Sequence, residues 1–543
     1  MSALTTRKAI AMNRMLPWTL AAAALCLSAL VHAAAPGITG PTFTLTAHDA
    51  TISQPDGQAV YSWGYGCTTA PAAAAFVPAA IAAAPTTPFC NTMQVPGPTL
   101  VVTEGQAVSV TLTNALPASA GNTSILFPGI TVTTSGGVAG LLTQEAAPGG
   151  TVTYTFTAPS PGTRAYYSGT QSDLQVEMGL YGAIIVLPSA GAPTNGACPT
   201  HNDAAGLNTA GTALVAGGEN DFRLSPTGAA FHLKQSCYDR EYLFQFSEMD
   251  PNIHLQAQAQ VTARSGCTAG AAGCSLSVPT EPYHPVYFMI NGRSMPDDMD
   301  TNYAAQYPHQ PYNGNPHMHP GELVLLRIIG QGRWQHPFHE HGNHVRILAR
   351  DGNLITSSTS ATQLAGPLLF TTTTTPGLAM DGIFYWTGKG LNWDAYAHHP
   401  GSADALATLP CTADANGYNT GTLTAVNYYE WCQDHNKPVQ TAPFGDVAGG
   451  GPVSLPDANL FTNGAWYGGS PYLGPNATIR ATGPTGTTPP SGTIANPPGT
   501  EAGFAFMWHS HNEREITTNN IFPGGMLMMM LVDSREFVID ESL

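Results

Sequence analysis

Histidines are concentrated in two short segments of this sequence. Four of its 18 histidines lie between residues 336 and 344, and two more flank Ser510. In a β-strand, residues i and i+2 point to the same face, so a His-x-His unit presents two imidazoles side by side. If the two segments form neighbouring strands, about 4.8 Å apart, their imidazoles converge. The candidate metal ligands are His336, His339, His341, His509 and His511.

The chemistry of this residue type points to a transition metal. Imidazole nitrogen suits Cu, Zn, Fe and Ni. A lone histidine is more often a surface or core residue than a ligand, but two His-x-His units in one β-rich block favour a metal site. Carboxylates commonly orient such ligands from the next layer, and Glu340, Glu513 and Glu515 are candidates for that role.

Other histidines and methionines give weaker signals. His317 and His319 lie between two prolines, which favours a surface loop over a ligand pair, and His398-His399 reads as a solvated pair. Met526 and the run Met528–Met530 resemble a soft Cu(I) surface. On a terminal strand after two glycines, however, they are more often core residues.

Short alternating segments predict the strands that position these side chains. Thr151–Thr157 alternates threonine with Val, Tyr and Phe, and a further apolar strand is expected from Glu322. We predict an all-β protein of two β-sandwich domains with long loops, at residues 34–190 and 240–543, joined by a linker or strap at 191–239. A region rich in Gly, Pro and Thr, about 400–500, reads as an insertion in the second domain.

The N-terminus has the features of a secretory signal. Arg7, Lys8 and Arg14 precede an apolar run, Leu16–Val31, that ends in small residues. This pattern predicts a signal peptide spanning residues 1–33, cleaved after Ala33, and the run is too short for a stable membrane span. We therefore predict a secreted or periplasmic protein.

Cysteine count and charge agree with that compartment. Eight cysteines follow the leader, and an even set in an exported chain reads as disulfides. Sequential pairing is the simplest guess: Cys67–Cys90, Cys198–Cys237, Cys267–Cys274 and Cys411–Cys432. A formal net charge of -17 argues against nucleic acid and anionic membrane surfaces as partners.

Four segments together resemble the multicopper oxidase superfamily. His336-Pro-Phe-His-Glu-His-Gly342 is similar to the family's HPxHxHG motif, and Trp508-His-Ser-His511 with Gly525-Met526 to its HCHxxxHxxxxGM motif. Val95–Thr99 and Gly162–Gly182 resemble first-domain segments. The resemblance implies cupredoxin-like Greek-key sandwiches, a copper cluster held by four His-x-His pairs, and a blue copper centre held by Cys, two His and a weak axial ligand. Two-domain members of the family usually form trimers.

Several ligand positions of that family are replaced here. Leu126 and Pro128 stand where the first domain should carry one His-x-His pair, and Tyr167-Ser168-Gly169 stands where it should carry the other. The blue-copper cysteine is Ser510, and the second blue-copper histidine falls on Glu515 or Asn520, depending on which anchor is used for counting. A serine hydroxyl cannot replace a thiolate as a soft ligand. The resemblance therefore implies copper ligands in the second domain alone, with His336 at one blue-centre position.

Three functions are compatible with this residue set. The first is a copper-dependent oxidoreductase with a mononuclear or reduced cluster and no blue centre. The second is a protein that sequesters or delivers copper. The third is a structural or interaction protein on a degenerate oxidase scaffold. Copper is the expected metal, zinc remains open, and a homotrimer is implied by the resemblance alone.

Overall fold

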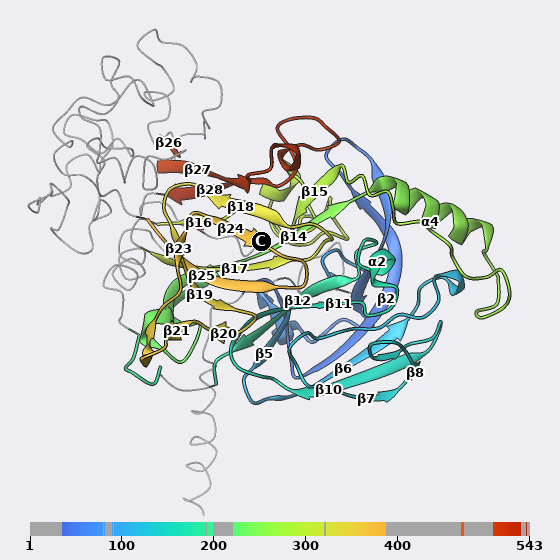
Figure 1. The fold of residues 1–543 in the computed structure, drawn as a ribbon, viewed down its shortest axis with the longest axis horizontal. Coiled ribbons are helices and arrows are strands. Elements are labelled where there is room, and N and C mark those ends of the chain that lie inside the picture. Colours follow the sequence, from blue (N-terminus) through green and yellow to red (C-terminus); the bar gives the residue numbers. More distant parts are fainter. Residues whose placement is uncertain are drawn as a thin grey trace, which may run out of the picture. The chain divides into compact units, whose positions relative to one another are not determined.

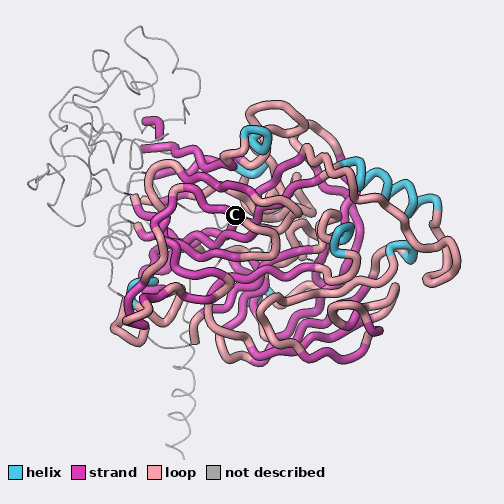
Figure 2. Tube along the Cα trace, in the orientation of Figure 1, coloured by secondary structure: helices cyan, strands magenta, loops and turns pink. Residues whose placement is uncertain are grey.

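Strands dominate the computed structural model of this chain (Figures 1 and 2). The structure describes residues 35–79, 81, 89–90, 92–189, 193–198, 221–319, 322–386, 469–471, 503–533 and 539. The predicted leader and the predicted Cys411–Cys432 pair lie outside these residues, as does the predicted insertion apart from Gly469–Pro471.

The first sandwich consists of two five-stranded sheets, ordered β11-β12-β5-β1-β4 and β3-β2-β6-β10-β7. Alternation along β10 buries Val152, Tyr154 and Phe156 and leaves its threonines facing out, as period-two patterning requires. The strands are β1 (Gly37–Thr39), β2 (Thr42–Ser53), β3 (Ala59–Cys67), β4 (Phe76–Val77), β5 (Leu100–Thr103), β6 (Ala107–Asn114), β7 (Thr133–Gly136), β10 (Thr151–Thr157), β11 (Gly162–Tyr167) and β12 (Tyr181–Leu187).

The second sandwich packs an eight-stranded sheet with core order β13-β14-β17-β25-β19-β20 and a six-stranded sheet with core order β16-β28-β27-β18-β24. The first of these comprises β13 (Leu224–Ala229), β14 (Cys237–Met249), β15 (Tyr287–Ile290), β17 (Leu323–Gly330), β19 (Val345–Arg350), β20 (Asn353–Leu354), β23 (Leu368–Leu369) and β25 (Ala379–Tyr385). The second comprises β16 (His317–Met318), β18 (His336–Glu340), β24 (Thr371–Thr374), β26 (Gly469–Pro471), β27 (Gly503–Ser510) and β28 (Leu527–Asp533).

Smaller elements complete the described chain. The two-stranded pairs are β8 (Val138–Ala139) with β9 (Gln144–Glu145) and β21 (Thr356–Ser357) with β22 (Ser360–Leu364). The helices are α2 (Ser172–Gln175) and α4 (Pro251–Ala263), and the 3-10 turns are η1 (Ala73–Ala75), η3 (Ala118–Ala120), η4 (Lys234–Ser236), η5 (Asp297–Met299) and η8 (Glu513–Ile516). Among these residues, no helix is long and apolar enough to cross a membrane.

The predicted fold class is confirmed, since the structure is all-β with cupredoxin-like sandwiches and long loops. The prediction of methionines as core residues is also confirmed for Met526, Met528 and Met530, which are fully buried in the second core. Three predicted disulfides are present: Cys67–Cys90, Cys198–Cys237 and Cys267–Cys274. Disulfides are typical of extracellular or periplasmic proteins.

Three features differ from expectation. The all-β prediction did not include a helix, yet α4 spans 13 residues and begins after Asp250, whose side chain accepts from the backbone N–H of Asn252. Part of the predicted linker forms β13, which pairs with β14. The surface-loop reading of His317 and His319 is wrong, because both are buried where β16 joins the second sandwich beside β28.

Candidate metal centre

The two His-x-His units lie on neighbouring strands, as the sequence predicts. Strands β18 and β27 pair antiparallel with His339 directly opposite His509. The pairing continues past both strand ends. There the backbone N–H of His341 donates to the carbonyl oxygen of Met507, and that of His511 donates to the carbonyl oxygen of Pro337. Because side chains alternate along both strands, all four imidazoles lie on the same face of the sheet.

The four rings form one cluster. The centroid of the His339 ring lies 4.7 Å from that of His341, 5.6 Å from that of His509 and 5.0 Å from that of His511. The His509 centroid lies 5.1 Å from that of His341 and 5.6 Å from that of His511. We call these four residues the histidine cluster.

Hydrogen bonds orient two rings of the histidine cluster. Nδ1 of His509 lies 2.7 Å from the carbonyl oxygen of Ser510, and since a carbonyl only accepts, Nδ1 carries the proton. The lone pair of His509 is therefore on Nε2, which lies 3.2 Å from Nε2 of His341. Nδ1 of His339 is 2.7 Å from Oγ1 of Thr371 on β24. Such a bond from the second ring nitrogen is how proteins commonly fix a metal-binding imidazole.

The surroundings of His339 and His509 favour the neutral form of these two rings. Burial, together with the charges that His509 and His511 would carry, lowers the pKa of His339 to about 4. Burial also lowers the pKa of His509. Neutral imidazole is the form that donates a lone pair to a metal.

The four side chains are of a type that binds a metal, but their rings are not yet arranged around one ion. All four donors are imidazoles, a set that suits copper or zinc. Yet within the described residues no three His, Cys, Asp or Glu side chains are already arranged around one ion. Metal binding would therefore require the rings to turn. His511, whose side chain is 49% exposed, marks the side of the histidine cluster that is open to solvent.

His336 has surroundings unlike those of the other four histidines. It is completely buried, with Nδ1 2.9 Å from a carboxylate oxygen of Glu515 and Nε2 2.9 Å from one of Glu248. Burial by itself lowers the pKa of His336, but the two carboxylates outweigh it and raise the pKa to about 9. Both ring nitrogens thus donate to glutamates, and His336 is an imidazolium at neutral pH.

The residues around His336 occupy the positions that the resemblance assigns to a blue copper centre. Ser510, fully buried, donates its hydroxyl to the Glu515 oxygen that also faces His336. The amide of Asn512 donates to the other Glu515 oxygen over 2.8 Å. Of the two residues that counting allowed beside His336, the structure places Glu515 there, whereas Asn520 is exposed.

Of the three predicted outer carboxylates, only that of Glu513 lies beside a residue of the histidine cluster. Glu340 alternates to the opposite face, where burial raises its pKa to about 8 and the Thr372 hydroxyl donates to it over 2.9 Å. Glu515 contacts His336 instead, and Glu513 lies 3.9 Å from Nδ1 of His511. The groups that orient the rings of His339 and His509 are the Thr371 hydroxyl and the Ser510 carbonyl, and neither contact is marked by a sequence motif. Only their position beside a histidine strand could have indicated them.

The first sandwich has an antiparallel bridge, without histidines, where the resemblance expects its ligand pairs. Leu126 and Tyr167 pair across two adjacent segments, and the backbone N–H of Leu126 donates to the carbonyl oxygen of Tyr167 over 2.7 Å. The Leu126 side chain lies against Gly169, and the Ser168 hydroxyl donates to Gln175 over 2.6 Å. Hydrophobic and hydroxyl groups thus fill the positions where the resemblance expects ligands.

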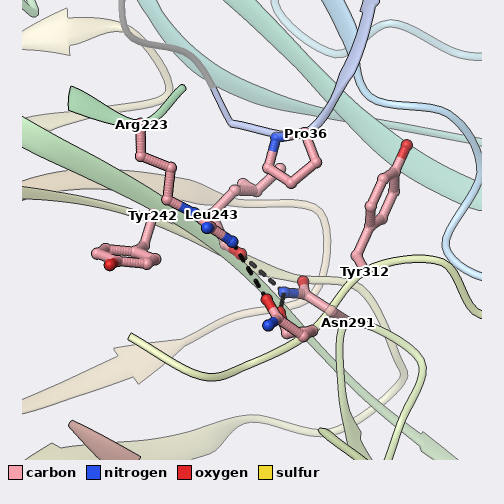
Figure 3. Close-up of a pocket in the computed structure, with 7 residues that line it drawn as sticks. Pro36, Arg223, Tyr242, Leu243, Asn291 and Tyr312 are labelled. Carbon is pink, nitrogen blue, oxygen red and sulfur yellow. Dashed lines mark hydrogen bonds between the residues drawn. The ribbon is translucent and has the colours of Figure 1, made fainter. Parts of the chain in front are cut away.

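The pocket drawn in Figure 3 is lined by none of the four residues of the histidine cluster and is too small for a substrate. Its volume of about 10 Å³ has room for roughly one water molecule. Its lining residues are Pro36, Arg223, Tyr242, Leu243, Asn291, Tyr312 and Asn313.

Comparison with known proteins gives the same family on both sandwiches. Sequence profiles described as multicopper oxidase match residues 82–191 and 279–379. Multicopper oxidase CTB12 of Cercospora beticola is 36% identical over 100 residues, which are 18% of this chain and 15% of that protein. The blue copper oxidase of Nitrosomonas europaea is 14% identical, with TM-score 0.43, over 90% of this chain and 85% of its own. The multicopper oxidase mgLAC is 15% identical, with TM-score 0.43, over 91% and 86%.

Proposed function

Because the chain belongs to the multicopper oxidase superfamily, we propose that it binds copper through His339, His341, His509 and His511. The observation that carries this proposal is the 3.2 Å separation of the His341 and His509 Nε2 atoms. Two imidazole nitrogens that share one tetrahedral ion, each about 2.0–2.1 Å from it, lie about 3.3 Å apart. The four available ligands suffice for a mononuclear site.

We further propose a copper-dependent oxidoreductase that lacks a blue copper centre. Bound copper would supply one-electron redox chemistry. The chain's own residues would hold the ion on one face of the sheet, and the exposed side of His511 would give a small reactant access. At the blue-centre position, Ser510 replaces the thiolate, and the imidazolium of His336 has both nitrogens bound to carboxylates. For His336 to act as a fifth ligand, as predicted, its imidazolium must lose one proton and one of these two carboxylate contacts must break.

The same proposal includes export. Three disulfides support an oxidising compartment, and a signal peptide would deliver the chain there. Trimer assembly stays a prediction from the resemblance.

Metal analysis with electron paramagnetic resonance tests the copper proposal. We expect purified, copper-loaded protein to hold about one copper per chain with a type-2-like signal and no intense blue colour. The double variant His339→Ala/His509→Ala should lose the copper, whereas His48→Ala, at an exposed histidine of the first sandwich, should keep it. Zinc alone, or copper that survives the double variant, would contradict the proposal.

Copper sequestration is the second candidate, favoured by the replacement of the blue centre, through which substrate electrons would enter. An assay for oxidation of phenols, Mn²⁺, Fe²⁺ or Cu⁺ by the copper-loaded protein distinguishes the oxidoreductase from the sequestration protein. O₂ consumption that the double variant abolishes supports the oxidoreductase, whereas tight copper binding without turnover supports sequestration. A degenerate structural scaffold, the third reading, requires that copper does not bind tightly.

A further inference from the structure

The first described residue of the chain is buried beside a buried acid. Ala35 is 0% exposed, and its backbone nitrogen lies 2.6 Å from Oε1 of Glu241 on β14. Glu241 is itself 0% exposed. A carboxylate removed from water is costly unless it is paired and hydrogen bonded, so the donor at Ala35 contributes directly to keeping this charge inside the protein.

The other oxygen of Glu241 belongs to a buried ion cluster. Nη2 of Arg327 lies 2.9 Å from Oε2 of Glu241, and Nη1 of Arg327 lies 3.2 Å from Oδ1 of Asp381. Two carboxylates therefore share this guanidinium. Arg164 interacts electrostatically with Asp381, but its guanidinium donates to Ser160. A second cation at Oε1 of Glu241 would complete the pairing of that carboxylate.

Ala35 also lies at the join between the two sandwiches. Its methyl group belongs to a buried apolar cluster formed by residues of β11, β12, β14, β17 and β25, namely Ala165, Ala183, Ile185, Leu243, Ile329 and Ala379. The next residue, Pro36, lines the small pocket with Leu243 (Figure 3). At Gly37 a Cβ would lie 2.4 Å from the carbonyl oxygen of Thr99, so the segment runs tightly against the first sandwich.

We propose that the mature chain begins at Ala35 and that its α-ammonium group forms a buried ion pair with Glu241, which locks the two sandwiches together. Hydrolysis of the Ala34–Ala35 peptide bond by a peptidase of the export route adds water across that bond and releases a carboxylate on Ala34 and an amine on Ala35. The predicted cleavage after Ala33 would instead start the chain at Ala34, one residue earlier. The proposal rests on the proposed export and is independent of copper binding.

The first test is the N-terminus of the protein exported through its own leader. Intact mass and N-terminal sequencing should give a chain that starts at Ala35. A chain that starts at Ala34, or one that keeps the leader, would overturn the proposal.

The second test is the reactivity of the amine in a folded chain produced to start at Ala35. An amine held as a buried ammonium is protected from acylation, because only the free base reacts. We expect acylation of the Ala35 amine to be about tenfold slower or more than in Glu241→Gln, as a pKa rise of one unit implies. The control Glu281→Gln, at a glutamate 71% exposed, should react as the parent does.

The outcomes separate this proposal from the copper proposal. Equal acylation rates in the parent and Glu241→Gln would contradict the ion pair. If Glu241→Gln does not fold, a folded chain that starts at Ala34 replaces it. Its amine is one residue removed from the contact with Glu241 and should react faster than that of the parent. Copper content should stay the same in every variant, since Glu241 lies outside the histidine cluster.

Discussion

The two sandwiches use the same local construction for different purposes. In the second, His339 and His509 face each other across β18 and β27. In the first, Leu126 and Tyr167 face each other across two paired segments, and Leu126 lies against Gly169. Since the backbone pairing persists without histidines, ligands are not needed to hold such segments together. The histidines of the second sandwich therefore call for an explanation other than architecture.

Removing facing residues from each sandwich should test this comparison most clearly. His339→Ala/His509→Ala should abolish copper binding, whereas Leu126→Ala should leave copper content unchanged and lower the free energy of unfolding by about 1–3 kcal/mol, because Leu126 is only partly buried. Metal analysis measures the copper content, and denaturant unfolding measures the free energy of unfolding. Copper loss in Leu126→Ala would mean that the first sandwich contributes to the site.

His336→Ala should cause the largest loss of stability. It leaves Glu248 and Glu515 buried without their shared cation, at a cost of about 3–5 kcal/mol. Denaturant unfolding measures the loss, with the exposed His48→Ala as control. Copper content should not change. Copper loss with unaltered stability would instead make His336 a ligand.

The pH dependence of stability follows from the same imidazolium. The pKa of His336 is raised from 6.5 in the unfolded chain to about 9 in the folded one. Its contribution to stability is therefore complete below about pH 6.5 and is lost as pH rises through 9. Thermal unfolding of the metal-free protein should shift to lower temperature between pH 7 and pH 10, and His336→Ala should show a smaller shift. The same slope in both proteins would contradict the assignment.

Thr371→Val should weaken copper binding without abolishing it. The variant removes the hydroxyl that orients His339, and loss of such a partner typically costs about 10–100-fold in metal affinity. Thr373→Val is the matched control, since Thr373 lies on the same face of β24 and pairs with Pro337. Competitive copper titration should distinguish the two variants, and equal affinities would assign Thr371 a packing role only.

Ser510→Cys should have the smallest effect. Restoring a thiol leaves Glu515 and the charged His336 in place, so copper loading should not produce intense blue absorption. Loss of the hydroxyl bond to Glu515 should cost about 1 kcal/mol in unfolding free energy. A blue Ser510→Cys protein would show that this position still accepts copper.

Sequence reasoning succeeded where the relevant contacts are encoded within a strand. The two His-x-His units and their alternation were enough to bring His339 opposite His509, because strand periodicity fixes the face. It could not find Thr371 or Glu248, which reach His339 and His336 from other strands and follow no spacing rule. Burial of His317 was missed for the same reason, since pairing with β28 decides it.

The antiparallel pairing of β18 with β27 also has a consequence for the order of assembly. The rings of His341 and His509 meet across 168 positions of sequence. Contacts that are so distant along the chain carry a large loop-closure cost and form late in folding. A polypeptide that emerges N-terminus first therefore holds only half of the cluster until its last strands arrive, so that an ion can be captured with full affinity only by an essentially finished chain.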